Sequence, residues 1–178
     1  MATPFSNSPS LASFGKYVLA YLSIFLLFMM DFIPLHIGDL SALRPPFFLI
    51  ALFFWTVFRP SFLSPLLIFA LGLMADIISS YPLGITPIIM LVTQWGLKKQ
   101  QRFLSGQAFP ILWIGFFLTS IAVCFAYWAS FSLLTFELAP FLGHATGYFL
   151  GLFIFPLLLF PLHILNRWLT PSDETPMV

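Results

Sequence analysis

Charged residues are scarce in this chain. Asp, Glu, Lys and Arg make up 7% of its 178 residues, whereas 60% are hydrophobic and 19% are aromatic. A soluble domain contains about 25% charged residues. A soluble protein of this length could not bury so much apolar surface, so lipid must solvate a large part of the chain. We therefore expect an all-α membrane protein.

The sequence also lacks the groupings that metal sites and common enzymes require. Its one cysteine, Cys124, excludes a disulfide within the chain and forms no metal site by itself. No histidine has a second histidine or a carboxylate at metal-ligand spacing, and the three are His36, His144 and His163. Nucleophile-elbow, zinc-protease, phosphate-loop and dinucleotide motifs are absent. We expect no catalytic residue, metal or cofactor, and a net charge of +1 argues against a nucleic-acid partner.

Six apolar segments are predicted to be transmembrane helices, at about 16–33, 45–58, 62–80, 82–97, 109–135 and 141–165. They form one transmembrane domain, 14–168, between a disordered tail at 1–13 and a polar tail at 169–178. Segment 45–58 would give only about 21 Å of helix, against ~30 Å of hydrocarbon. The alternative is that 45–58 is a re-entrant or interfacial segment.

The basic residues predict the orientation. Lys98, Lys99 and Arg102 place the loop after the fourth segment in the cytoplasm. With six spans both termini are cytoplasmic, and six Lys or Arg lie inside against Arg44 alone outside. Five spans give the same score. We prefer six because 46–58 has no charge and because five would require translocation of the N-terminal tail.

Asp76 lies near the end of the third apolar segment, between Ala75 and Ile77. Burying an aspartate in mid-bilayer costs roughly 2.5–3.5 kcal/mol, so a compensating partner is required. Six spans put Arg44 on the same side of the membrane, which predicts an Arg44–Asp76 ion pair or a network that includes Asp31 or Asp39.

A second arrangement satisfies both residues separately. Arg44 would then extend to a lipid phosphate. Asp76 would bond Ser79, Ser80 or the backbone at the start of the fourth segment, where the helix dipole favours an acid.

Small residues recur at helical spacing in two segments. Gly72, Ala75 and Ser79 share a face with Asp76, and a second series consists of Gly143, Gly147 and Gly151. Such faces let helices approach closely. They could pack within this chain or against another membrane protein.

The order Arg44-Pro45, a short apolar span, then Gly72, Asp76, Ser79, Pro82, Leu83 and Gly84 resembles the rod shape-determining protein MreD family. The resemblance covers about 43–168. It implies a non-catalytic component of the cell-elongation machinery in the bacterial inner membrane, supporting peptidoglycan synthesis. An MreC-like protein is the expected partner, besides membrane lipids, with further links to MreB, RodA and a class B penicillin-binding protein.

The resemblance also implies a helical layout similar to the substrate-binding subunits of energy-coupling-factor transporters. Arg44, Asp76 and the turn 81–84 would then lie near the outer surface. Our leading hypothesis is a scaffold that docks membrane helices. The alternative is a small-molecule-binding subunit of a transporter, with Trp55, Asp76 or Tyr81 lining a pocket. An enzyme of lipid chemistry is a third hypothesis, for which the acidic clusters are missing.

Overall fold

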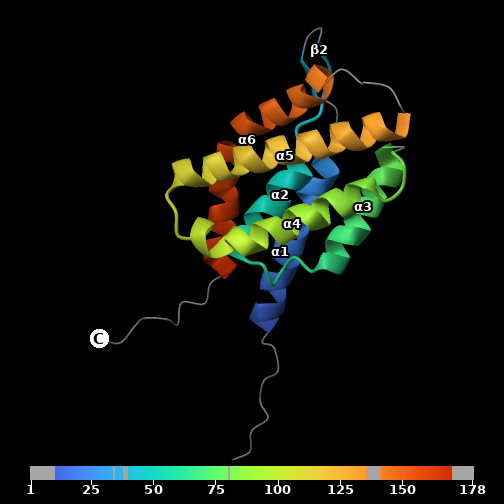
Figure 1. The fold of residues 1–178 in the computed structure, drawn as a ribbon. Helices are drawn as coiled ribbons and strands as arrows, with labels where there is room; N and C mark the ends of the chain where they lie inside the picture. The colour runs from blue at the N-terminus through green and yellow to red at the C-terminus, as the bar shows by residue number, and fades with distance from the viewer. Residues whose placement is uncertain (1–10, 34, 38–39, 80, 136–140, 170–178) are drawn as a thin grey trace, which may run out of the picture.

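The computed structural model describes residues 11–33, 35–37, 40–79, 81–135 and 141–169. Six helices form a bundle (Figure 1), which confirms the helical class; the helices are α1 (Leu11–Met30), α2 (Phe47–Phe58), α3 (Pro65–Ser79), α4 (Ile85–Leu104), α5 (Phe109–Thr135) and α6 (Phe141–Leu169). A two-stranded antiparallel sheet lies between α1 and α2 and consists of β1 (Leu35–Ile37) and β2 (Leu40–Leu43).

Consecutive helices run in opposite directions, so the bundle has two distinct ends (Figure 1). Asp31, Arg44 and Asp76 lie at the end where α1 and α3 finish and α2 and α4 begin; we call it the carboxylate end. The other end contains the first turn of α1 and the last turn of α6. Its described Lys and Arg residues define the basic end: Arg59, Lys98, Lys99, Arg102 and Arg167.

Helix α2 occupies the centre of the bundle and contacts α1, α4, α5 and α6. Every residue from Phe47 to Val57 is buried, in keeping with a sequence that is apolar on all sides. The Phe53 ring meets Phe116 of α5 and Phe155 of α6 edge-on, with centroids 5.5 and 5.6 Å away, and those two rings stack at 4.2 Å. An interfacial helix would leave one face uncovered, so this burial favours a segment inside the bundle. Whether 45–58 crosses the membrane or re-enters it stays a prediction.

Three predicted boundaries differ from the structure. Helix α4 continues to Leu104 through the basic run that we expected to be a loop, since Lys, Gln and Arg all favour helix. Helix α1 begins at Leu11, inside the predicted tail 1–13, while residues 1–10 lie outside the described part. Between the first two predicted segments, where no strand was predicted, the chain forms the strands β1 and β2.

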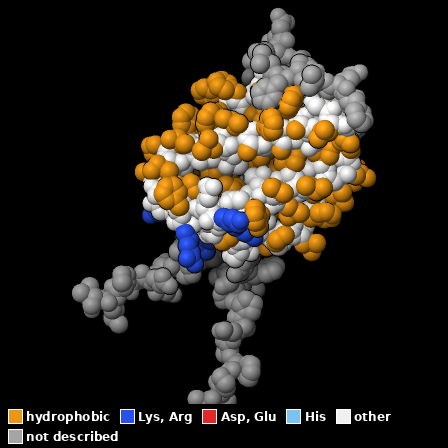
Figure 2. Space-filling view, in the orientation of Figure 1, with side chains coloured by type: hydrophobic (Ala, Val, Ile, Leu, Met, Phe, Trp, Pro, Cys, Tyr) orange, Lys and Arg blue, Asp and Glu red, His pale blue; other side chains and the backbone are white. Residues whose placement is uncertain are grey.

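The outer surface of the bundle is apolar. Figure 2 shows hydrophobic side chains spread over the face formed by α3, α4 and α5. Two helices, Phe109–Leu134 and Ala145–Leu169, are long and apolar enough to cross a membrane. Helix α6 includes Pro156 and Pro161, and it changes direction between its two halves in Figure 1, as internal prolines cause.

Candidate functional site

Asp76, in the last turn of α3, is fully buried and accepts hydrogen bonds at both carboxylate oxygens. The backbone N–H of Gly84 donates to Oδ2 at 2.7 Å, and that of Thr86 donates to Oδ1 at 3.2 Å. These two amides belong to the N-terminus of α4, where the first N–H groups have no partner within the helix. The side chain of Asp76 therefore caps α4 from the preceding helix.

The turn between α3 and α4 holds the two amides in place. The N–H of Tyr81 donates to the Asp76 carbonyl at 3.0 Å, which closes the end of α3. Gly84 has φ +103°, a left-handed conformation that residues with a Cβ adopt at a cost. Pro82 is exposed in the turn and Ser79 is half-buried at the end of α3. The sequence Pro82-Leu83-Gly84 thus turns the chain so that α4 starts against the Asp76 carboxylate.

Asp31 performs the same task for α2. It follows the last residue of α1, and its Oδ1 accepts the N–H of Phe47, the first residue of α2, at 2.8 Å. The charge of Arg44 and the N–H of Phe48 also act on this carboxyl group. We did not predict this cap. One feature of the sequence could have predicted the cap. An acid follows the first apolar helix, and the next helix begins without a capping side chain of its own.

Two tyrosines extend the polar contacts across the bundle. The Tyr127 hydroxyl of α5 donates to Oγ1 of Thr86 at 3.1 Å, and the Tyr127 ring lies beside that of Tyr81, with centroids 6.5 Å apart. The carboxylate end therefore contains a polar cluster, made of Asp31, Asp76, Tyr81, Thr86 and Tyr127.

Arg44 lies at the carboxylate end but does not belong to the polar cluster. Its side chain is exposed, and within the described residues it forms no ion pair with Asp76, whose oxygens are taken by Gly84 and Thr86. The direct pair that we predicted first is therefore wrong in this structure. The second arrangement is the one observed for Asp76, since the backbone at the start of α4 is its partner. Asp39 lies outside the described residues.

The glycines predicted as close-packing positions do bring elements together. A Cβ on Gly72 would stand 2.7 Å from Cα of Pro87 in α4. In α6, a Cβ on Gly147 would collide with the carbonyl oxygen of Arg44, and one on Gly151 would lie 2.7 Å from Cδ of Pro46. These glycines therefore pack within the chain. Pro45 is buried between these contacts, whereas the surroundings of Gly143 are not described.

Histidines and carboxylates are few and scattered among the described residues. No group of three His, Cys, Asp or Glu among them could hold a metal ion. The His163 ring packs on Phe58, with centroids 4.7 Å apart, and His36 and His144 have no described side chains. Both carboxylates that the structure describes accept backbone N–H groups.

The pocket residues that we considered lie at opposite ends of the bundle. The Trp55 ring packs on Phe62, which precedes α3, with centroids 5.7 Å apart, whereas Asp76 is in the last turn of α3. Trp55 is fully buried and its indole N–H has no partner among the described residues. Trp55 thus lies apart from Asp76, whereas Tyr81 lies beside Asp76.

Comparison with known proteins gives a family for this bundle. No curated protein and no solved structure matches the chain, so the expected likeness to energy-coupling-factor subunits stays a prediction. The model of the family described as rod shape-determining protein MreD matches residues 13–169, which includes all six helices apart from the first two residues of α1. This is a family of bacterial membrane proteins that determine rod shape and is not known as a family of enzymes. With a match over nearly its whole length, the chain belongs to the MreD family.

Proposed function

We propose that this protein is a non-catalytic scaffold of the cell-elongation machinery in the bacterial inner membrane. Its role would be to dock an MreC-like membrane protein and so to support peptidoglycan synthesis and cell shape. MreB, RodA and a class B penicillin-binding protein would belong to the same assembly. The main support is family membership together with an interior whose only described carboxylates cap helices.

The distribution of apolar side chains favours a scaffold within the bilayer. Helices α3 and α6 expose large side chains outward, including Phe69 and Ile77 in α3 and Phe153 and Phe160 in α6. The capping bonds and glycine contacts fix the helices that present these faces. Association of helices in lipid depends on such fixed, closely packing surfaces.

We further propose six spans with both termini in the cytoplasm. Every described Lys and Arg except Arg44 lies at the basic end, as the positive-inside rule requires for a cytoplasmic end. An N-terminal reporter fusion tests this orientation. Activity of a cytoplasmic reporter is expected, and a reporter active only in the periplasm would contradict it.

Photo-crosslinking tests the scaffold role. A photoreactive phenylalanine analogue is introduced at Phe69 or Ile77 of α3, and at Phe153 or Phe160 of α6, in cells that produce a tagged MreC-like protein. We expect a crosslinked product of the two chains from at least one helix. The matched control is the same analogue at Phe117 of α5, which is also exposed. Absence of a product at all four positions, or equal yields from all three helices, would contradict a specific docking face.

A further inference from the structure

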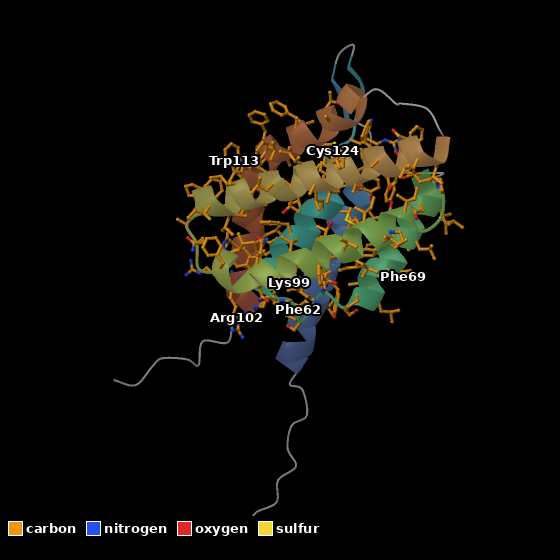
Figure 3. All side chains as sticks on the ribbon, in the orientation of Figure 1. Phe62, Phe69, Lys99, Arg102, Trp113 and Cys124 are labelled. Carbon is orange, nitrogen blue, oxygen red and sulfur yellow. The ribbon has the colours of Figure 1, made fainter. Side chains whose placement is uncertain are left out.

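The last turns of α4 carry an exposed strip that the scaffold role does not explain. Trp95, Lys99, Arg102 and Phe103 are spaced by four, three and one residues, so they share one face of the helix. All four are exposed, Trp95 and Phe103 at 62% each. Figure 3 shows Lys99 and Arg102 near the same end of α4, and Figure 2 shows Lys and Arg atoms gathered there beside hydrophobic side chains.

Lys99 is held over the Trp95 ring. Its Nζ lies 3.4 Å from the ring centroid, a cation–π geometry that orients the ammonium group and leaves its charge intact. The Trp95 side chain is exposed, and its indole N–H makes no hydrogen bond to the residues that the structure describes. The strip therefore presents an oriented ammonium, a guanidinium and an N–H donor, all without a protein acceptor in the described part.

No carboxylate balances these cations in the part of the chain that the structure describes. The acids found there are Asp31 and Asp76, and both cap helices at the opposite end of the bundle. The basic end thus has a local excess of positive charge beside two exposed aromatic rings. A solvated protein surface would not need the rings, and a purely lipid-facing surface would not contain the charges.

We propose that this strip binds the headgroup of an anionic phospholipid. Lys99 and Arg102 would contact the phosphate, the Trp95 N–H would reach the headgroup oxygens, and the rings of Trp95 and Phe103 would lie against the glycerol and acyl region. Trp and Lys or Arg are typical of the membrane–water interface, and basic clusters there attract anionic lipids. The proposal depends on the membrane location of the family and not on the docking of an MreC-like partner.

Native mass spectrometry of the full-length protein in detergent tests this site. The protein is titrated with phosphatidylglycerol, with phosphatidylcholine, and with phosphatidylglycerol in the presence of inorganic phosphate. We expect preferential binding of phosphatidylglycerol, weak competition by inorganic phosphate, and a loss of at least about tenfold in affinity for the double variant Lys99→Gln/Arg102→Gln. Equal binding of the two lipids, or full displacement by inorganic phosphate, would overturn the proposal.

The matched control removes the same charge from the same end of the bundle. Lys16→Gln/Arg167→Gln also loses two cations, but these residues belong to α1 and α6 and not to α4. Its affinity is expected to stay within about twofold of the parent, because only diffuse attraction changes. An equal loss in both double variants would show general charge attraction and would overturn a defined site.

A single variant gives a second test that does not alter the charge. Trp95→Phe keeps a ring beneath Lys99 and removes the N–H donor, so we expect phosphatidylglycerol affinity to fall about threefold to fivefold. Unchanged affinity in both Trp95→Phe and Lys99→Gln/Arg102→Gln would remove the strip as the binding site. Crosslinking to an MreC-like protein, measured separately, should be unaffected by these variants.

Discussion

The N–H of Gly84 donates a 2.7 Å hydrogen bond to Oδ2 of Asp76, and this bond joins the end of α3 to the start of α4. The Asp31–Phe47 bond joins α1 to α2 at the same end of the bundle. In both places an acid that would be unfavourable in lipid satisfies amides that would be equally unfavourable there. The starts of two helices thus compensate one buried carboxylate, Asp76, and one half-buried carboxylate, Asp31.

Replacement of Asp76 should destabilise the bundle. Asp76→Ala leaves the amides of Gly84 and Thr86 without acceptors, at about 1–3 kcal/mol for an unsatisfied buried group. Asp76→Asn keeps one oxygen acceptor and should lose about half as much. Thermal unfolding of the purified protein in detergent measures both, with Ser79→Ala as the control on the same turn. Equal stability of Asp76→Ala and the parent would contradict the capping role.

Replacement of two glycines near α4 by alanine should affect the stability of the protein differently. Gly84 has φ +103° and open space around its Cα, so Gly84→Ala adds backbone strain of about 1–2 kcal/mol without a clash. Gly96 lies inside α4, also with open space, and Gly96→Ala should be neutral or stabilising by up to about 1 kcal/mol. Unfolding temperatures of the two variants provide the comparison. A loss of stability at Gly96 equal to that at Gly84 would contradict the left-handed turn.

Much of the fold could be predicted from apolar segments, but less of the site. The six apolar segments correspond to the six helices, because a long apolar run in lipid has few alternatives to a helix. The sequence alone could not identify the partner of Asp76, because every residue except proline has a backbone N–H. Only the folded turn at Pro82–Gly84 directs two of these N–H groups toward the Asp76 carboxylate. The basic run was also a poor guide to the end of α4, because Lys, Gln and Arg favour helix and α4 continues through them to Leu104.

Replacement of Gly72 by a larger residue should disturb the packing of α3 against α4. Gly72→Ala puts a Cβ 2.7 Å from Cα of Pro87, a backbone atom that cannot turn aside, and should cost about 1–3 kcal/mol. Gly115→Ala is the matched control, because its nearest neighbour is the flexible Leu104 Cδ2 at 3.0 Å. We expect a clearly smaller loss there, measured by thermal unfolding. Equal losses would indicate general helix effects and not the α3–α4 contact.

The cluster also predicts which acid responds to Arg44. Arg44 acts electrostatically on Asp31 and forms no ion pair with Asp76. A double-mutant cycle of Arg44→Gln with Asp31→Asn should therefore give a coupling energy of about 0.5 kcal/mol, in the range of exposed pairs. The cycle of Arg44→Gln with Asp76→Asn should give a value near zero. Unfolding in detergent measures all five variants, and strong coupling in the second cycle would restore the Arg44–Asp76 pair that the bonds to Gly84 and Thr86 exclude.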